Sequence, residues 1–409
     1  MSGGIQRPKV FMMDVLATVP YYTAYLSKAL LVEHVNVTVG SISYYLDPVC
    51  FSSRGIKIDP GLLDVVGKFQ LSRLPRRILK LIEATLNLAA LTVRFLTDPP
   101  DVIHVQYLPM LKWRAPLDLW FVEFFRKRGS KIVLTVHDLL PHDTGEAYKE
   151  TFCNLYHMVD GIICHSDHIR ARLGAEFTVP EGKISVIPHG PFFYDLPTVG
   201  PEQTLQSFQI EPGKIVFLWQ GIIFPYKGID LLLLAWQKVE AHSENACLVI
   251  AGTGAPQLLD QIREQVAQLD LKRVKLHFRF ISSEELVALY RAADVVVYPY
   301  RAITTSGALA TGLALAKTIV ASDLPVFREL LTDRENALLV DPQDSIELAD
   351  ALVELAQDTA LRERLAGRVR MMNFGDHSWH SIARKTMQTY ENVLSSSYPL
   401  EVEGGTLSP

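Results

Sequence analysis

The stretch Val297–Leu330, VYPYRAITTSGALATGLALAKTIVASDLPVFREL, decides the fold that the sequence predicts. Its first residues close a continuous apolar run, Val295–Tyr298, which indicates a buried strand. An apolar helix is predicted at Ala308–Ala316 and a second buried strand at Thr318–Ser322. A strand, a helix and another strand in close succession are the repeating unit of a parallel sheet covered by helices on both faces.

A polar loop of small residues joins the first of these strands to the helix. Thr304, Thr305, Ser306 and Gly307 stand where the loop becomes the helix. The first turn of a helix carries backbone N–H groups without a partner inside the helix, at the positive end of its dipole. Small side chains leave these groups accessible, so the segment is a candidate site for an anion, above all phosphate. Thr and Ser also cap helices without any ligand, and an ordinary capped turn is the alternative.

The composition narrows the class of protein. With 409 residues, of which 48% are hydrophobic and 21% charged, the chain predicts a globular protein of two domains. A net charge of −5 argues against a general nucleic-acid binder. The four cysteines show neither metal-ligand spacing nor a disulfide framework, which favours a reduced, cytoplasmic protein. Asp14 interrupts the only early apolar run, so we expect no signal peptide, and no uncharged run approaches the ~18 residues of a membrane span.

Short apolar runs alternate with helical patterns along almost the whole chain, which predicts an α/β protein built on parallel sheets. The remaining strands are predicted at Val10–Met13, Val35–Val39, Val102–Val105, Ile132–Val136, Gly161–Cys164, Ile184–Ile187, Ile215–Trp219, Leu248–Ala251, Lys275–Phe278 and Ala337–Val340. The remaining helices are predicted at Ala24–Val32, Arg76–Phe95, Leu117–Arg126, Tyr148–His157, Ile229–Ala241, Gln257–Gln268, Glu284–Arg291 and Ser345–Ala356.

The alternation pauses at Pro188–Pro212, a polar stretch that contains Pro and Gly, and then restarts. We therefore expect two doubly wound parallel-sheet domains, residues 1–195 and 208–377, that face an interdomain cleft. Ligands of open α/β sheets bind beyond the carboxyl ends of the strands, so the cleft is the expected site. A last helix at 378–395 is expected to pack back onto the first domain, and 396–409 are expected to form a flexible tail.

Several predicted strands end in residues that carry chemistry. His137 and Asp138 follow one strand, and His189 follows another. Gly221 follows a third, with Lys227 a few residues later in a turn before a helix. The ammonium of Lys227 is therefore placed to meet a phosphate at the start of that helix. The structural alternatives are a histidine that ties a loop to its strand and a solvated lysine in an exposed turn.

The order of these motifs resembles that of a known family. The pattern strand-Gln-Gly-x₅-Lys-Gly-x-Asp-x-Leu, then LVIAGTG, FISSEELVALYRAADVVVYPY and the Ser-Gly loop, is similar to glycosyltransferase family 4 of the GT-B superfamily. VIHVQYLP, LTVHD, GIICHSDHIRARL and SVIPHG occur in the order that the family shows in its first domain. The resemblance covers nearly the whole chain. It implies the GT-B fold and a retaining transfer of sugar from a nucleotide-diphosphate donor, with no cofactor and no metal at the diphosphate.

The resemblance also implies roles for particular residues. Lys227 matches the lysine that neutralises the donor diphosphate, and His137 matches the histidine beside the reacting sugar; these two are the expected catalytic residues. A departing diphosphate needs its charge held, so cations and amides dominate the expected site. The other expected donor-binding residues are Gly221, Arg279, Arg301, Thr304, Thr305, Ser306, Gly307, Ala308 and Thr311. The residues expected on the acceptor side of the cleft are Tyr21, Tyr22, Asp138 and His189.

Two departures from the family pattern bear on the activity. The family usually has an arginine shortly after the glycine at position 221, where this chain has Ile222 and Phe224. The Glu-x₇-Glu element of the family is also missing, with Ala302 near the first glutamate and Thr311 at the second, which commonly holds the donor ribose. The expected function is transfer to a polysaccharide-precursor, lipid-linked or small-molecule acceptor. A catalytically degenerate protein that acts as a partner subunit is the alternative.

The segment Lys68–Phe95 predicts an amphipathic helix. The residues of its basic face are Arg73, Arg76, Arg77 and Lys80, and those of the opposite apolar stripe are Leu79, Ile82, Leu86 and Val93. Helices of this kind rest on anionic membranes, which would place the protein peripherally at the inner face of the membrane, beside a lipid-linked acceptor. The alternative is a core helix with a solvated basic face.

Overall fold

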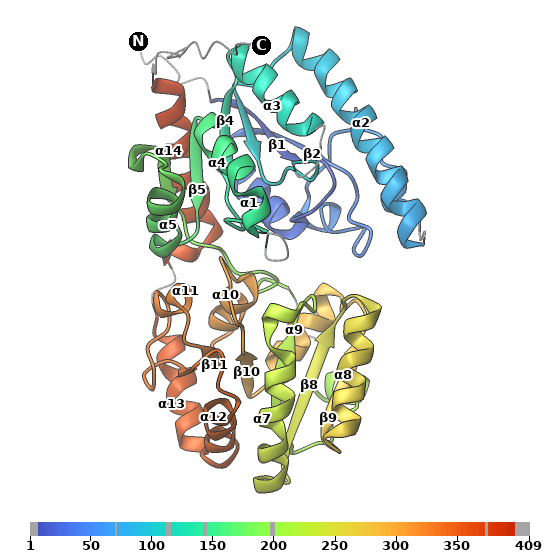
Figure 1. Cartoon of the computed structure of the whole chain (residues 1–409), viewed down its shortest axis with the longest axis vertical. Helices are drawn as coiled ribbons and strands as arrows, with labels where there is room; N and C mark the ends of the chain where they lie inside the picture. The colour runs from blue at the N-terminus through green and yellow to red at the C-terminus, as the bar shows by residue number, and fades with distance from the viewer. Residues whose placement is uncertain are drawn as a thin grey trace.

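Two sheets of parallel strands form two domains, which Figure 1 shows one above the other. The computed structural model describes residues 7–69, 72–111, 116–141, 145–196, 201–372 and 375–396. The tail expected at 396–409 lies outside the described residues, apart from Ser396.

The first domain is built on six strands. They are β1 (Lys9–Asp14), β2 (Asn36–Ser41), β3 (Val102–Val105), β4 (Lys131–Thr135), β5 (Gly161–Cys164) and β6 (Ile184–Val186), in the spatial order β2-β1-β3-β4-β5-β6. The helices are α1 (Pro20–Val32), α2 (Arg73–Thr97), α3 (Leu117–Lys127), α4 (Lys149–Met158) and α5 (Asp167–Phe177).

The second domain repeats this plan with the order β12-β11-β10-β7-β8-β9. Its strands are β7 (Ile215–Gln220), β8 (Ala246–Gly252), β9 (Val274–Phe278), β10 (Val295–Tyr298), β11 (Thr318–Ser322) and β12 (Leu338–Val340). The helices that follow the first domain in sequence are α6 (Pro201–Ser207), α7 (Ile229–His242), α8 (Pro256–Gln268), α9 (Ser283–Ala292), α10 (Gly307–Ala314), α11 (Pro325–Arg328), α12 (Ser345–Gln357), α13 (Thr359–Arg370) and α14 (Trp379–Ser395).

Every predicted strand overlaps an observed one, and the predicted fold class of two doubly wound parallel sheets is confirmed. Helices α5, α6, α11 and α13 were not predicted. In α5 the buried residues are only Ile169, Leu173 and Phe177, which lie four apart on one face of the helix. Three apolar residues among many charged ones make a periodicity too weak to recognise in the sequence.

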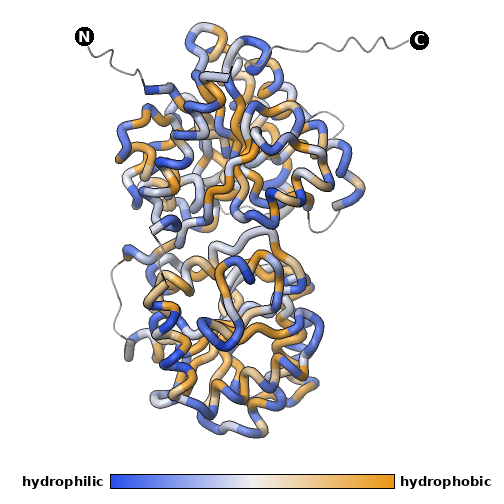
Figure 2. The backbone as a smooth tube through the Cα atoms, turned by 90° about the vertical axis from the view of Figure 1, so that its left-hand side faces the viewer, coloured by the Kyte–Doolittle hydropathy of each residue, from blue (hydrophilic) through white to orange (hydrophobic). Residues whose placement is uncertain are grey.

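Apolar side chains form a core on each face of both sheets, because successive strand residues point to opposite sides. In β1, Phe11 and Met13 join buried residues of α2 and α3, whereas Val10 and Met12 join residues of α1 and α14. Figure 2 shows the hydrophobic segments running through the middle of each domain. Helix α14 comes last in the sequence but packs on the first domain beside α1, as Figure 1 shows.

The two domains also contact each other near α5 and α11. The carboxylate of Glu329, which follows α11, accepts hydrogen bonds from the backbone N–H groups of Asp167 and His168 at 3.1 and 2.7 Å. These residues begin α5. A carboxylate from the second domain therefore caps a helix N-terminus of the first, where the helix dipole favours negative charge.

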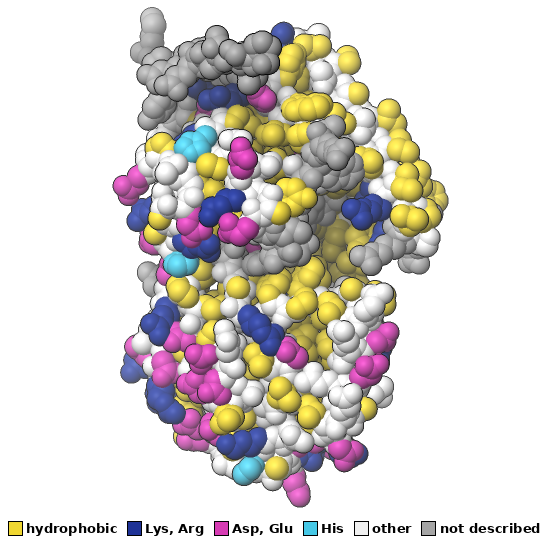
Figure 3. Space-filling model, in the orientation of Figure 1, with side chains coloured by type: hydrophobic (Ala, Val, Ile, Leu, Met, Phe, Trp, Pro, Cys, Tyr) yellow, Lys and Arg dark blue, Asp and Glu magenta, His cyan; other side chains and the backbone are white. Residues whose placement is uncertain are grey.

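Helix α2 has an apolar row that faces solvent. Leu74, Ile78, Ile82, Leu86 and Val93 are each between 50% and 70% exposed. Hydrophobic side chains gather along the right edge of the upper domain in Figure 3, where Figure 1 places α2. The interpretation of α2 as a core helix that buries this stripe is therefore wrong, because other residues face the sheet. The buried residues of α2 on that side are Ala84, Leu88, Leu91 and Phe95.

The contact of α2 with a membrane stays a prediction. None of the described helices is both long and apolar enough to cross a bilayer.

Candidate active site

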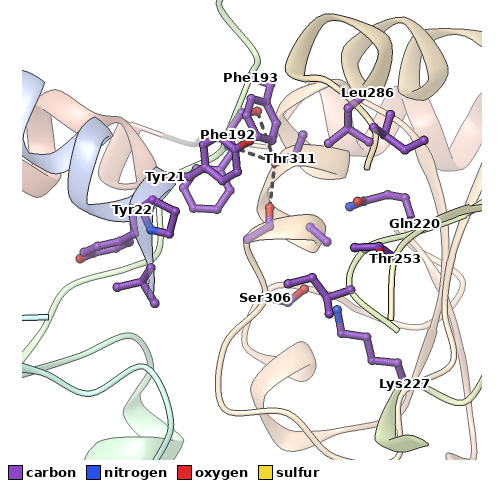
Figure 4. Close-up of a pocket in the computed structure, with 18 of the residues that line it drawn as sticks. Tyr21, Tyr22, Phe192, Phe193, Gln220, Lys227, Thr253, Leu286, Ser306 and Thr311 are labelled. Carbon is purple, nitrogen blue, oxygen red and sulfur yellow. Dashed lines mark hydrogen bonds between the residues drawn. The ribbon is translucent and has the colours of Figure 1, made fainter. Parts of the chain in front are cut away.

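A cavity of about 390 Å³ lies between the two domains at the carboxyl ends of their strands. On its first-domain side, His137 comes shortly after β4. On its second-domain side, Gln220 closes β7 and Gly252 closes β8, while α10 contributes its N-terminus. Figure 4 shows side chains of both domains converging on this space. Because parallel strands all end at the same edge of a sheet, residues far apart in the sequence meet here.

The N-terminus of α10 forms one wall of the cavity. Ser306 caps the helix, and its hydroxyl accepts a hydrogen bond from the backbone N–H of Leu309 at 3.1 Å. Gly307 follows, packed so closely against the first domain that a Cβ there would lie 2.6 Å from Phe192 and 2.9 Å from His189. Glycine is therefore required for the approach of the two domains. The remaining first-turn amides have the orientation of an anion site.

Lys227 provides a cation beside this helix start. It ends a 3-10 turn, Pro225–Lys227, and the next residue, Gly228, has a φ of 68° and so little room that a Cβ would lie 1.8 Å from the carbonyl oxygen of Pro299. The turn directs the Lys227 side chain toward Ser306, as Figure 4 shows. Its Nζ atom lies 5.9 Å from the ring centre of Trp219.

The environment of Lys227 differs from the exposed turn that the sequence suggested. The side chain is partly buried and lines the cavity. Burial lowers its pKa to about 8, and the charge of Asp138 opposes that shift. No ion pair joins the ammonium to a carboxylate anywhere in the described ranges of the chain. A desolvated cation of this kind gains most when an anionic ligand arrives.

His137 faces Lys227 from the first domain. Its Nε2 atom lies 3.2 Å from Oε1 of Gln106, so Nε2 carries the proton and Nδ1 is left as an acceptor. Burial, followed by the charges of His165, His189 and His104, lowers the pKa of His137 well below its ordinary value. The imidazole is therefore neutral at physiological pH and can accept a hydrogen bond from a hydroxyl group.

Aromatic rings surround His137 and make this part of the wall uncharged, beside the carboxylate of Asp138. The ring of Tyr22 lies 4.8 Å from that of His137, 5.3 Å from that of His165 and 5.2 Å from that of His189. Burial lowers the pKa of His165 to about 4 and that of His189 to about 3. Neutral aromatic and imidazole rings on one side of the cavity, with a cation on the other, suit a ligand with a sugar at one end and phosphates at the other.

Most of the predicted site residues line this one cavity. They are Tyr21, Tyr22, His137, Asp138, His189, Gly221, Lys227, Arg279, Thr305, Ser306, Gly307, Ala308 and Thr311. Arg301 does not line it, because both of its terminal nitrogens bond to the carboxylate of Asp230, at 2.8 and 2.6 Å. Thr304 does not line it either, since its side chain is buried beneath the loop.

Sequence reasoning also missed part of the lining. Phe192 and Phe193 belong to the segment between the domains, while Gly252 ends β8 and Thr253 follows it. The position of Thr253 beyond a strand end was a usable signal. No signal in the sequence identified Phe192 and Phe193, because the pattern of a linker does not indicate which of its side chains face the cavity.

Two family models match most of the chain, one in each domain. Residues 21–190 match the model described as Glycosyltransferase Family 4, and residues 214–358 match the one described as Glycosyl transferases group 1. The chain belongs to glycosyltransferase family 4.

Known relatives and solved structures agree with this family and with the GT-B fold. An uncharacterized glycosyltransferase of Methanocaldococcus jannaschii is 26% identical over 57% of this chain and 60% of its own length. The phosphatidyl-myo-inositol mannosyltransferase of Mycobacterium leprae is 33% identical over 46% of this chain and 50% of its own length. The chain thus spans only about half to three fifths of these curated relatives. The crystal structure of Anabaena Alr3699/HepE in complex with UDP and glucose has a TM-score of 0.72 at 17% identity, covering 94% of this chain and 100% of that one.

The departures from the family 4 pattern are visible in the cavity. Ile222 lines it where the family has an arginine, and Phe224 instead stacks on Tyr226. Arg279 does line the cavity, but its guanidinium is paired with the carboxylate of Glu285 at 2.8 and 2.6 Å. Among the described lining residues, Lys227 is therefore the one cation without an ion-pair partner.

Thr311 stands where family 4 commonly has the carboxylate for the donor ribose. Its hydroxyl donates to the carbonyl of Gly307 at 2.8 Å and accepts from the backbone N–H of Phe192 at 3.0 Å. The dashed lines in Figure 4 mark its bonds to the segment between the domains. In this chain Thr311 therefore connects α10 to the segment between the domains.

Proposed function

We propose that the protein is a retaining glycosyltransferase that moves a sugar from a nucleotide-diphosphate donor to an acceptor hydroxyl. One observation carries this proposal: the start of α10 and the unpaired ammonium of Lys227 meet in one cavity, opposite the neutral His137. The family supports the proposal, and so does the UDP and glucose in the printed description of the Anabaena structure.

In the proposed reaction, negative charge develops on the departing diphosphate, beside the start of α10 and the ammonium of Lys227. The bond between the sugar C1 and the diphosphate oxygen breaks, and the nucleoside diphosphate leaves with the electron pair. The N–H groups of α10 and the ammonium of Lys227 stabilise the departing charge, without a need for a bound metal. The acceptor oxygen forms the new bond to C1 on the same face, and its proton passes to the departing diphosphate. His137 orients the sugar by accepting a hydrogen bond at Nδ1.

A panel of nucleotide sugars tests this function. We expect one of the UDP-, GDP- or ADP-sugars to raise the melting temperature of the purified protein, because a ligand that binds only the folded state stabilises it by mass action. The stabilisation should reach about 2.7 kcal/mol at a ligand concentration of 100 times Kd. Hydrolysis of the same donor should release its nucleoside diphosphate in the presence of EDTA. A folded protein that responds to no nucleotide would favour the partner-subunit alternative.

We propose further that α2 contacts a membrane surface through its exposed apolar row, which would bring the cleft to a lipid-linked acceptor. Two more large apolar side chains, Trp120 and Phe124 of the neighbouring α3, are 52% and 43% exposed. Arg128 caps the same helix and supplies positive charge for anionic lipid headgroups, whereas the charge of Lys127 is paired with Glu123 at 2.7 Å. The phospholipid in the name of the mycobacterial relative supports this acceptor class.

Vesicle sedimentation tests the membrane contact. The protein is expected to sediment with vesicles of phosphatidylglycerol and phosphatidylcholine, and the double change Ile78→Asp and Ile82→Asp should reduce the bound fraction at least tenfold, since each buried side chain contributes ~1.5–3 kcal/mol. Ile346→Asp is the matched control, because Ile346 is 69% exposed on α12 of the other domain. Equal binding by the double variant and the control would rule out α2 as the contact.

A further inference from the structure

A second cavity, of about 340 Å³, opens beside the cleft on the first domain. Its walls are the first turns of α2, Leu16 from the loop after β1, Tyr45, and the pair Pro109 and Met110. Nothing in the proposed transfer of the sugar uses this cavity.

Three cations of α2 line the second cavity. Arg76 and Lys80 both contact the ring of Tyr45, with the guanidinium carbon 4.2 Å and Nζ 5.0 Å from its centre. Lys80 also donates to the carbonyl oxygen of Leu16 at 3.4 Å. Arg77 completes the group. Across the described parts of the chain, no carboxylate forms an ion pair with any of the three.

The phase of the helix shows that these cations point toward the protein body. Residues three or four apart share a helical face. Arg76 and Lys80 therefore continue the row that Ala84, Leu88 and Leu91 extend into the core. The exposed apolar row of α2 lies on the opposite side. Arg76 and Lys80 are therefore half-buried beside a cavity, whereas the basic face of a core helix would be fully solvated.

Holding the charges of Arg76, Arg77 and Lys80 close together costs electrostatic free energy when no anion is bound. Burial and the neighbouring charge of Arg76 lower the pKa of Lys80, and the charges of Asp14 and Glu83 only oppose this shift. Like charges that share a partly buried site without a counter-ion repel each other and lose hydration. A phosphate group removes both penalties, and guanidinium groups match its oxygens in pairs.

The second cavity adjoins the proposed active site. Tyr45 lines it, while Tyr44 and Leu46 on either side line the cleft. Pro109 is shared with a smaller pocket that extends to His137 and Asp138. A molecule held by its phosphate at α2 would therefore lie beside the cleft.

We propose that Arg76, Arg77 and Lys80 bind the phosphate group of the acceptor, so that the acceptor is a phosphate-bearing polyol or sugar. That the bound molecule is the acceptor rests on the proposed function. That its phosphate binds to these three residues does not. The phosphate can belong to a soluble ester or to a lipid headgroup, and the chemistry of recognition is the same.

Calorimetric titration with glycerol 1-phosphate tests the site in the whole protein without any donor. The double change Arg76→Gln and Lys80→Gln is expected to raise Kd at least tenfold, because two charge-assisted contacts are lost. Lys227→Ala is the matched control: it removes one cation from the cleft and should leave this binding intact. Uncharged glycerol should not bind. Arg77→Gln serves as a second, more exposed variant, and melting temperatures identify any variant that does not fold.

Two results would overturn the proposal: wild-type affinity in the folded double variant, or loss of all binding in Lys227→Ala, which would place the phosphate in the cleft. Vesicles separate the two sources. Binding to phosphatidylglycerol vesicles that the double variant loses identifies a lipid headgroup, and binding of glycerol 1-phosphate with no such difference identifies a soluble ester. The nucleotide panel on the unaltered protein keeps the proposals apart, because a missing nucleotide response there contradicts only the proposed function.

Discussion

Replacing Lys227 by alanine is expected to weaken donor binding and to slow turnover, each by more than tenfold. The ammonium is the one cation in the described lining of the cleft without an ion-pair partner, so no neighbour can take its place. A charge-assisted hydrogen bond contributes ~1.5–3 kcal/mol, which corresponds to a factor of ten or more in affinity. Titration calorimetry with the donor that responds in the panel, together with initial rates, measures both losses.

The pH dependence provides an independent test of the same group. Because the pKa of Lys227 is lowered to about 8, its ammonium is charged below that pH and neutral above it. The ratio kcat/KM, which reports the free enzyme, should therefore fall as the pH rises through about 8. In Lys227→Arg the guanidinium stays charged, so this fall should disappear. Normal donor affinity in a folded Lys227→Ala protein would remove the residue from the site.

Replacing His137 by alanine is expected to reduce turnover about a hundredfold, the loss that a small misplacement of the reacting group can cause. In the proposed role the residue accepts a hydrogen bond and transfers no proton, and its neutral imidazole contacts Gln106 and Tyr22. Nucleotide affinity and melting temperature should stay nearly unchanged, because the proposed diphosphate site lies in the other domain. Partial rescue is expected in His137→Asn, whose side chain retains a hydrogen-bond acceptor.

A purely structural role of His137 predicts a different pattern. If the ring only ties the loop after β4 to its strand, the alanine variant should lose stability, and its activity should fall only in proportion to the folded fraction. Normal turnover at low temperature in a destabilised variant would contradict the assignment. Measuring melting temperature and kcat on the same preparation separates the two roles.

The periodicity of the sequence was sufficient to predict the two sheets. Continuous runs such as Val295–Tyr298 are typical of strands buried on both faces, and the edge where they end must carry the ligand. The same rule located most of the cavity lining. The rule failed for Arg301. This residue lies close in sequence to residues that line the cavity, but the rule does not reveal that its side chain pairs with Asp230 of α7.

The orientation of α2 could not be predicted from the sequence, for another reason. Periodicity tells which residues share a helical face, but it does not tell which face meets the sheet. The apolar stripe through Ile82 and Leu86 satisfied every criterion of a core face, yet the structure exposes it. The row from Lys80 to Phe95 contains the residues that are buried, and it begins with a cation because its first part borders a cavity.

The bond between Glu329 and the start of α5 has a consequence for the opening of the cleft. Any separation of the domains that parts α11 from α5 must return two N–H groups and a carboxylate to water. An exposed charge at a helix N-terminus contributes about 0.3–1 kcal/mol, and the upper value changes an equilibrium about fivefold. The contact would therefore adjust the proportion of time that the cleft is open without holding it shut, although none of its three residues lines the cavity.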